Sequence, residues 1–299
     1  MSAVELRGRK IADAIREQAR GDIAALAREG RVPHLVSLVV GDNAPAQIYI
    51  KNQKSSCEDV GIQYSLYHFD GRTSERMLDS HIQALNQNPE VSGIIVQLPL
   101  PEGVNARALH NRIDPKKDVE GVNLANLGRL FYRTPALVPC TAMGALELIR
   151  STGVELRGAE AVIVGHSEIV GKPLALLLMN ELATATVCHI GTRDLAEHTR
   201  RADILVVAAG RAGLIAADMV KAGAIVIDVG INQVHAHDEQ GQRLVDSRGQ
   251  PQMKTVGDVD YEAVRKIAGY ITPVPGGVGP LTVAMLIRNT VATCQASRA

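Results

Sequence analysis

No excess of either charge is present in this 299-residue chain, since lysine plus arginine and aspartate plus glutamate both number 32. Proteins that bind nucleic acids usually carry a basic surplus, so a nucleic-acid partner is not expected. Long apolar runs are missing too: no segment approaches the roughly 18 apolar residues of a membrane-spanning helix, and the first ten residues hold no apolar signal-peptide core. We therefore expect no membrane partner.

Cysteine is scarce and scattered. The four cysteines lie far apart and form no C-x-x-C pair; they are Cys57, Cys140, Cys188 and Cys294. This spacing predicts neither a zinc site nor a disulfide framework, and we expect no metal in the site. The expectation is a reduced, cytoplasmic protein that acts on small molecules.

The overall composition is typical of a globular protein, with 46% hydrophobic and 21% charged residues, and this length predicts about two domains. Residues 4–29 carry apolar side chains at helical spacings of three and four, and Gly30 ends that helix. Strands and helices then alternate at 35–40 (strand), 46–60 (helix), 62–69 (strand), 74–86 (helix), 91–97 (strand) and 104–112 (helix). Such β–α repetition predicts an α/β fold, a parallel sheet with helices on both faces.

Residues 135–141 mark the crossing into a second unit, where the alternation is more regular. Its apolar strands are expected at 161–164, 185–189, 204–208 and 225–229, followed by a polar surface excursion at 233–252. Parallel sheets of this kind bind ligands at the carboxyl ends of their strands. We predict a first domain of residues 1–140, completed by a C-terminal helix at 281–299, and a second domain of residues 141–280.

The second unit opens with a strand, a glycine turn and a helix. Gly165 and Gly171 bracket the turn, and Pro173 stands early in the helix, where its missing N–H costs nothing. Such a turn presents backbone N–H groups to a phosphate. Because the spacing is not G-x-G-x-x-G, an ordinary tight turn remains an alternative. A serine-nucleophile turn is excluded, since Ile169 stands where its second glycine must be.

Prolines and glycines crowd the segment from Thr272 to Thr282. Three of each fall within ten residues, which fixes the turn and brings its backbone close to a neighbour. A purely structural loop is one interpretation. A ligand-binding loop is the other, because so much constraint is unusual in a plain connection.

Six motifs follow one another along nearly the whole chain: Gln97-Leu-Pro-Leu-Pro101, Lys117-Asp-Val-Glu-Gly121, Pro139-Cys-Thr141, Gly165-x-Ser-x-x-Val-Gly-Lys-Pro173, Val256-Gly-Asp-Val259 and Thr272-Pro-Val-Pro-Gly-Gly-Val-Gly-Pro-x-Thr282. Together they resemble the methylenetetrahydrofolate dehydrogenase/cyclohydrolase family, and the last motif is highly specific. The resemblance implies a homodimer with a parallel-sheet, folate-binding catalytic domain and a Rossmann-like dinucleotide-binding domain. It also implies oxidation of 5,10-methylene- to 5,10-methenyl-tetrahydrofolate, followed by hydrolysis to 10-formyl-tetrahydrofolate.

The resemblance also assigns site residues. Catalytic roles fall to Tyr49, Gln53, Gln97, Asp118 and Glu120. Substrate binding falls to Tyr49, Gln97, Leu98, Pro99, Pro275, Gly276 and Gly277. Cofactor binding falls to Thr141, Gly165, His166, Ser167, Val170, Gly171, Pro173, Ile190, Arg193, Ile231, Thr272, Gly277 and Thr282. For each of these residues an ordinary role in a cap, a turn or the core is the alternative.

The sequence departs from the family pattern at the active-site lysine. Counting from Tyr49 to Gly61 without a gap places Gln53 there, and Glu120 replaces the usual aspartate. Hydride transfer needs no proton movement, whereas hydrolysis needs a group that titrates, which glutamine does not. We therefore predict that the dehydrogenase persists and that the cyclohydrolase is weak or lost.

Three other functions compete with this interpretation. A fully bifunctional enzyme would use Lys51 or Lys54 through a bent helix, although each helical step turns a side chain by about 100°. A catalytically idle folate-binding paralogue would explain the altered site. A shikimate-type dehydrogenase would explain the glycine turn after Val164 but not the two proline-rich motifs.

The cofactor is NADP on family grounds, with NAD as the alternative. His166 stands where the family usually has arginine and Ile190 where it has serine, the two side chains that contact the 2′-phosphate of NADP. Histidine is mostly neutral near pH 7, and isoleucine donates no hydrogen bond. Arg193 is near enough in sequence to compensate. Against NAD, no acidic residue ends the 185–189 strand to bind the ribose diol.

Overall fold

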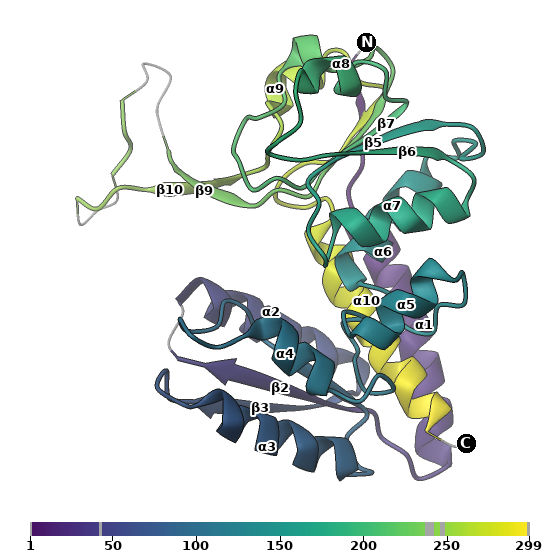
Figure 1. Ribbon diagram of the computed structural model, residues 1–299, viewed down its shortest axis with the longest axis vertical. Coiled ribbons are helices and arrows are strands. Elements are labelled where there is room, and N and C mark those ends of the chain that lie inside the picture. Colours follow the sequence, from purple (N-terminus) through teal and green to yellow (C-terminus); the bar gives the residue numbers. More distant parts are fainter. Residues whose placement is uncertain (1, 42–43, 237–241, 246–248, 298–299) are drawn as a thin grey trace. The chain divides into compact units, whose positions relative to one another are not determined.

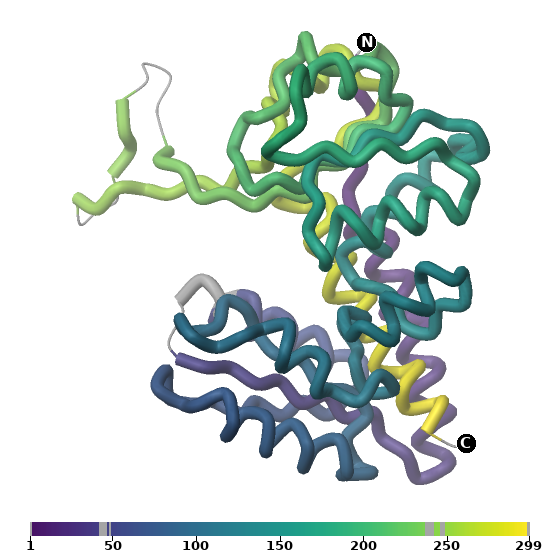
Figure 2. Tube along the Cα trace, in the orientation of Figure 1, coloured from purple at the N-terminus to yellow at the C-terminus, as the bar shows by residue number. Residues whose placement is uncertain are grey.

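The computed structural model describes residues 2–41, 44–236, 242–245 and 249–297. The chain forms two compact units, which are treated separately below. Unit 1 comprises Met1–Lys10 and Thr141–Leu281, and unit 2 comprises Ile11–Cys140 and Thr282–Ala299. Figure 1 labels most of the helices and several strands of both units, and Figure 2 traces the same chain as a tube.

Unit 2 contains a parallel sheet of three strands in the order β3–β2–β4. The strands are β2 (His34–Val40), β3 (Gln63–Phe69) and β4 (Gly93–Val96). The helices are α1 (Arg9–Arg28), α2 (Ala44–Val60), α3 (Glu75–Gln87), α4 (Ala106–Arg112), α5 (Leu124–Phe131) and α10 (Gly279–Ala296), of which α1 and α10 begin at residues of unit 1.

The central strand β2 explains why helices lie on both faces of this sheet. Successive side chains of a strand point to opposite faces. Val36 and Leu38 pack with apolar residues of α3 and α4 in one buried cluster. Ser37 points the other way and is bonded to Gln97, which in turn contacts Gln53 of α2. The predicted α/β layering is therefore confirmed in this unit.

Unit 1 contains a six-stranded sheet in the order β1–β11–β8–β7–β5–β6, in which every pair is parallel. The strands are β1 (Val4–Glu5), β5 (Glu160–Val164), β6 (Thr184–Cys188), β7 (Ile204–Val207), β8 (Ile225–Asp228) and β11 (Tyr270–Ile271). The helical elements are α6 (Cys140–Ser151), α7 (Gly171–Asn180), α8 (Leu195–Thr199), η1 (Ala217–Met219) and α9 (Tyr261–Val264). The predicted parallel sheet is confirmed, with each predicted strand displaced by one residue at most.

Three features of the fold differ from the sequence-based expectation. The first helix begins at Arg9 rather than residue 4, because Val4–Glu5 pairs with Tyr270–Ile271 as a sixth strand. This pairing also places Met1–Lys10 in unit 1 rather than with residues 11–140. Helix α5 was not predicted. The expected surface excursion at 233–252 overlaps β9 (Asn232–His235) and ends just before β10 (Met253–Val256). These two strands pair as an antiparallel hairpin that projects from unit 1 (Figure 1). Residues 237–241 and 246–248 of the excursion lie outside the described part of the chain.

All four cysteines are free and buried. None of the helices in the described ranges has the combination of length and apolarity that crossing a membrane requires.

Candidate active site

A buried network of amide and hydroxyl groups lies in unit 2 at the carboxyl end of β4. Gln53 is fully buried on α2, and its Oε1 accepts two hydrogen bonds, from the Tyr64 hydroxyl at 2.8 Å and from Gln97 Nε2 at 2.9 Å. Gln97 Nε2 also donates to Ser37 Oγ at 3.0 Å. The two glutamines that the family resemblance assigned to catalysis are therefore in direct contact.

The Gln53 amide nitrogen has no such partner. Within the described residues, Gln53 Nε2 is buried and makes no hydrogen bond. An unpartnered buried donor costs about 1–3 kcal/mol, and it often marks a place where a ligand or an ordered water binds. The Gln53 carboxamide thus combines a saturated acceptor with two free donors.

Tyr49 precedes Gln53 by one helical turn on α2, which places both side chains on one face of the helix. Although 39% of Tyr49 is accessible, the protein around its ring desolvates the hydroxyl. This burial, followed by the negative charge of Glu120, raises the pKa of Tyr49. The phenol therefore stays protonated at neutral pH and can donate a hydrogen bond but cannot act as a base.

The two acidic residues of the Lys117–Gly121 motif have different surroundings. Asp118 is 1% exposed and accepts hydrogen bonds from Asn123 N and Asn126 Nδ2, each at 2.8 Å. Burial, and then the charge of Asp118, raise the pKa of Glu120 from 4.5 to about 8. Asp118 thus holds the loop together, whereas Glu120 carries a proton at neutral pH.

The loop beside Glu120 is anchored by the C-terminal helix. Asn289 of α10 donates from Nδ2 to the carbonyl oxygens of Val119 at 2.8 Å and Val138 at 3.3 Å. Within unit 2, helix α10 therefore supports the motif directly. Sequence reasoning named no role for Asn289.

The alternative lysines lie away from the buried network. Lys51 and Lys54 are both exposed, and Lys54 Nζ lies 3.8 Å from Glu58 Oε1 in an ion pair along the helix surface. Helix α2 continues without interruption from Ala44 to Val60. Neither lysine therefore takes the place of Gln53.

In unit 1, the predicted glycine turn joins β5 to α7. Gly165 has φ +121°, and a Cβ on it would lie 2.2 Å from the carbonyl oxygen of Ala208; a Cβ on Gly171 would clash with the carbonyl oxygen of Gly165. Both glycines are thus required by the packing of the chain on itself. Ser167 Oγ accepts from Val170 N at 3.2 Å, the turn role that was the alternative to cofactor binding.

The same turn leaves several backbone donors free. Within the described part of the chain, the N–H groups of His166, Ser167 and Ile169 donate no hydrogen bond. They lie just before the N-terminus of α7, where a helix dipole favours negative charge. This arrangement fits the pyrophosphate of a dinucleotide.

The carboxyl ends of β5 and β6 bring two histidines together. His166 and His189 meet edge to face with ring centroids 5.1 Å apart, and Gly191 N donates to His189 Nδ1 at 3.1 Å. Ile190 beside them is completely exposed, and Arg193 is exposed as well. The residues predicted near the adenosine ribose therefore gather at one edge of this sheet.

The proline-glycine loop is pinned inside unit 1. Gly277 N donates to Pro273 O at 2.8 Å, Gly8 N donates to Gly276 O at 3.0 Å, and the Thr272 hydroxyl accepts from Asp228 N at 2.7 Å. The Thr272 hydroxyl is therefore used in a hydrogen bond within unit 1. Pro275, which follows a cis peptide bond, is exposed.

Two buried carboxylates that the sequence analysis did not single out hold the strand ends of unit 1. Asp258 accepts from Ala209 N at 2.6 Å, Gly210 N at 2.8 Å and Asn232 Nδ2 at 2.8 Å. Asp228 accepts backbone N–H groups from Gly230, Asp258 and Val259, each at 2.9 Å. Asp258 lies in the Val256–Val259 motif, which therefore holds the segments that follow β7 and β8.

Two family models match the chain, one in each half. Residues 6–120 match the catalytic domain of tetrahydrofolate dehydrogenase/cyclohydrolase, and residues 139–298 match its NAD(P)-binding domain. The chain belongs to the tetrahydrofolate dehydrogenase/cyclohydrolase family. The NAD(P)-binding model includes the glycine turn and the proline-glycine loop, and the catalytic model includes the Gln53–Gln97 network.

Individual members of the family are similar over their full length. The chain is 47% identical over 286 residues to a bifunctional FolD protein of Roseobacter denitrificans, which covers 96% of this chain and 93% of that protein. A FolD methylenetetrahydrofolate dehydrogenase/cyclohydrolase of Campylobacter jejuni has a TM-score of 0.89 at 40% identity, with 99% of each chain covered. The Trypanosoma brucei enzyme, solved with NADP and an inhibitor, has a TM-score of 0.91 at 38% identity and full coverage of both chains.

The remaining residues assigned by the family resemblance have varied surroundings. Leu98 and Pro99 are exposed and joined by a cis peptide bond, while Val170 and Pro173 are buried at the start of α7. Ile231 is 70% exposed. Thr141 and Thr282 are half-buried and each takes part in a further interaction. Their contacts with a cofactor stay predictions.

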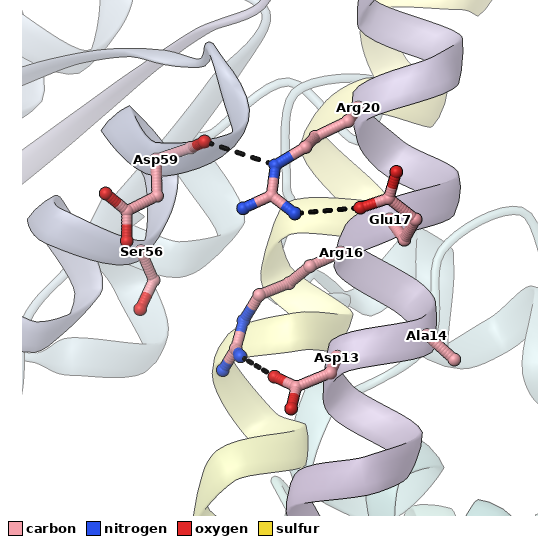
Figure 3. Close-up of a pocket in the computed structure, with 7 residues that line it drawn as sticks. All are labelled: Asp13, Ala14, Arg16, Glu17, Arg20, Ser56 and Asp59. Carbon is pink, nitrogen blue, oxygen red and sulfur yellow. Dashed lines mark hydrogen bonds and ion pairs between the residues drawn. The ribbon is translucent and has the colours of Figure 1, made fainter.

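A hollow of unit 2, lined by residues of α1 and α2, is a poor candidate for the active site. Figure 3 shows its arginines paired with neighbouring acids: Arg16 with Asp13 at 2.6 Å and Arg20 with Glu17 at 2.9 Å. Arg20 Nε also donates to the carbonyl oxygen of Asp59 at 3.3 Å. The charges around this hollow are therefore largely used by the protein itself.

Proposed function

We propose that this protein oxidises 5,10-methylene-tetrahydrofolate with a nicotinamide cofactor and hydrolyses the methenyl product weakly or not at all. The observation that carries the proposal is the buried, uncharged Gln53, which stands where the motif spacing puts the family lysine and is hydrogen-bonded to Gln97. Family membership supports the oxidation, as does the name of the Campylobacter jejuni neighbour, a methylenetetrahydrofolate dehydrogenase/cyclohydrolase.

Oxidation suits an uncharged site. When bound, the nicotinamide ring accepts a hydride from the methylene carbon of the folate. The reacting folate nitrogen supplies its own electron pair, so no side chain has to gain or lose a proton. Tyr49 and Gln97 then have only to hold the pterin, and a protonated Glu120 can donate a hydrogen bond to it.

Hydrolysis makes a demand that this site meets poorly. A water must lose a proton and a ring nitrogen must gain one. Gln53 cannot titrate, and the Tyr49 hydroxyl stays protonated because burial raises its pKa. Near pH 7 Glu120 carries its proton and is an acid rather than a base. No base for the attacking water is therefore present among these residues.

The test is a pair of spectrophotometric assays on the purified protein. Reduction of the dinucleotide by methylene-tetrahydrofolate should proceed, while methenyl-tetrahydrofolate should decay at close to the rate seen without enzyme. Hydrolysis as fast as oxidation would reject the proposal. Absence of any dinucleotide reduction would instead indicate a folate-binding protein without catalysis.

The fully bifunctional enzyme is the second candidate, and one observation favours it. Glu120 has a pKa of about 8 and therefore ionises within the range in which enzymes are assayed. As a carboxylate it could take the proton of a water. In that case hydrolysis should rise with pH around 8 and should disappear in Glu120→Gln.

For the cofactor we propose NADP, on the strength of the family and of the NADP-bound Trypanosoma brucei neighbour. The local side chains weaken this preference, because Ile190 is fully exposed and apolar and His166 packs against His189. We expect use of both dinucleotides. Comparison of kcat/KM for NADP and NAD tests this, and a preference for NADP above about a hundredfold, the worth of one strong charged contact, would contradict it.

We also propose a homodimer, in line with the family resemblance. The β9–β10 hairpin forms its own two-stranded sheet, and an isolated hairpin is marginally stable in water. Around it Val245 and Met253 are more than half exposed, as is Ile231 at its base. A second copy of the chain would bury these side chains. Sedimentation velocity at micromolar concentration should give twice the mass of 32.0 kDa.

A further inference from the structure

Tyr64 and Ser37 are the two members of the buried network to which the family resemblance gives no role. They lie on the neighbouring strands β3 and β2, on the face that α2 covers. Ser37 is the one hydroxyl in the strand His34–Val40, where its neighbours are apolar, and it is 0% exposed; Tyr64 is 9% exposed. A polar side chain is retained in such a core only where it has a partner.

The hydrogen bonds of these residues hold the Gln53 carboxamide in place. Tyr64 donates to Gln53 Oε1, and so does Gln97 Nε2. If the amide were turned over, its NH2 group would face the NH2 group of Gln97, donor against donor. The orientation found gives Gln53 Oε1 two donors and leaves Nε2 buried without a partner among the described residues.

The same bonds fix Gln97. Its Nε2 uses one N–H for Gln53 Oε1 and the other for Ser37 Oγ, which saturates the NH2 group. A side-chain amide with both donors used can point its Oε1 in one direction only. Gln97 follows directly after β4, at the edge of the sheet where open α/β sheets bind ligands.

We propose that Tyr64 is a positioning residue for the oxidation: its hydroxyl holds the Gln53 carboxamide, and through Gln53 it holds Gln97 in one orientation. This inference rests on the proposed function for its kinetic readout. Burial raises the Tyr64 pKa to about 12, so that the hydroxyl remains a donor throughout the working pH range. Tyr64 acts through Gln53 and is not itself assigned a contact with the substrate.

The test compares Tyr64→Phe, Gln53→Leu and the double variant. Loss of one buried hydrogen bond should lower kcat of Tyr64→Phe about fivefold, while KM for the dinucleotide stays unchanged. In the Gln53→Leu background the same change should have a much smaller effect on kcat, because the Gln53 acceptor is gone and only the contact of the Tyr64 hydroxyl with Ser37 is left. Tyr67→Phe is the matched control: Tyr67 is 43% exposed on the same strand, and its variant should behave as wild type.

Two results would overturn the proposal. The first is a double variant in which the two losses multiply, since Tyr64 would then act independently of Gln53. The second is a Tyr64→Phe enzyme with unchanged kcat. Should Tyr64→Phe fold poorly, Ser37→Ala probes the same restraint from the other N–H of Gln97, and it should lower kcat by a similar factor without affecting the dinucleotide KM.

A readout that does not need activity separates this inference from the proposed function. In ¹⁵N spectra of the side-chain amides, the Gln97 NH2 protons should exchange with water about fivefold faster in Tyr64→Phe than in wild type. Tyr67→Phe should leave their exchange unchanged. If the wild-type protein reduced no dinucleotide, the proposed function would be rejected. The difference in Gln97 amide exchange between Tyr64→Phe and wild type would still test the role of Tyr64, because it does not depend on activity. Equal exchange in Tyr64→Phe and wild type would reject that role.

Discussion

Glu120 and Asp118 lie two residues apart in one loop, and they have opposite roles because only one of them is satisfied by the fold. Asp118 accepts a backbone N–H and an asparagine amide. Glu120 is desolvated and lies close enough to Asp118 for that charge to act on it, which raises its pKa from 4.5 to about 8. The family motif therefore contains one structural carboxylate and one that titrates near neutrality.

This difference predicts a pH-dependent stability. Between pH 4.5 and about 8, Glu120 keeps its proton in the folded state but loses it in the unfolded state, so the unfolded state binds fewer protons. The free energy of unfolding should therefore fall as pH rises through this window and level off above it. Glu120→Gln, which cannot ionise, should lack this contribution and gain on the order of 1–3 kcal/mol over wild type between pH 5 and pH 8.5. Urea denaturation of both proteins at the two pH values measures the difference, and parallel curves would contradict it.

Gln53→Lys should raise methenyl hydrolysis specifically. It places a titrating amine where Tyr64 and Gln97 now donate to an amide oxygen. The same change buries a charge and should cost about 2–4 kcal/mol of stability, because two donors would face an ammonium group. Hydrolysis and thermal unfolding are measured on the same preparation.

Lys54→Gln is the control for that experiment. Lys54 is exposed and paired with Glu58 on the helix surface, so its removal should leave both reactions unchanged. Loss of residual hydrolysis in Lys54→Gln would mean that Lys54 performs the proton transfer expected of the family lysine that Gln53 replaces. In that event the weak hydrolysis would not be a consequence of Gln53.

Much of the fold was predictable, because apolar strands and helical spacings alternate regularly along the chain. The first helix was extended too far at its start: Val4 continues the apolar pattern, but its pairing with Tyr270 joins residues far apart in sequence. Helix α5 was missed because its eight residues form only about two turns, fewer than the roughly 11 to 18 residues over which helical spacing can be recognised. Long-range pairing and short helices are not encoded in local periodicity.

The site was predictable only in part. The motifs identified Gln53 and Gln97, but nothing in the sequence indicated that they bond to each other. Tyr64 gave no signal, because a tyrosine in an alternating strand is ordinary. Ser37 gave a weak signal, because it is the lone hydroxyl in an apolar strand and a buried hydroxyl requires a hydrogen-bond partner. Contacts between side chains of different elements appear only once the strands are in register.

Asp228→Asn should destabilise unit 1. Both carboxylate oxygens of Asp228 accept backbone N–H groups, three in all, and the side chain is 3% exposed. An asparagine would turn its NH2 group toward at least one of these donors, at a cost of about 2–4 kcal/mol. Asp218→Asn is the control: Asp218 is exposed and lies 3.8 Å from Arg200, so its change should stay within about 0.5 kcal/mol. Equal midpoints of urea denaturation for the two variants would refute the role of Asp228.

Gly171→Ala should damage dinucleotide binding more than folate binding. A Cβ at Gly171 would lie in the position of the Gly165 carbonyl oxygen, so the turn between β5 and α7 would have to open. The free N–H groups of His166 and Ser167 would move with it, and dinucleotide affinity measured by calorimetry should fall at least about tenfold, the equivalent of one lost charge-assisted hydrogen bond.

Gly21→Ala is the matched control, because Gly21 lies within α1 with open space around it; alanine there should raise stability by about 0.5–1 kcal/mol and leave both affinities unchanged. If Gly171→Ala bound the dinucleotide as wild type does, the turn could not be the pyrophosphate site, since opening it would displace every donor assigned to that role.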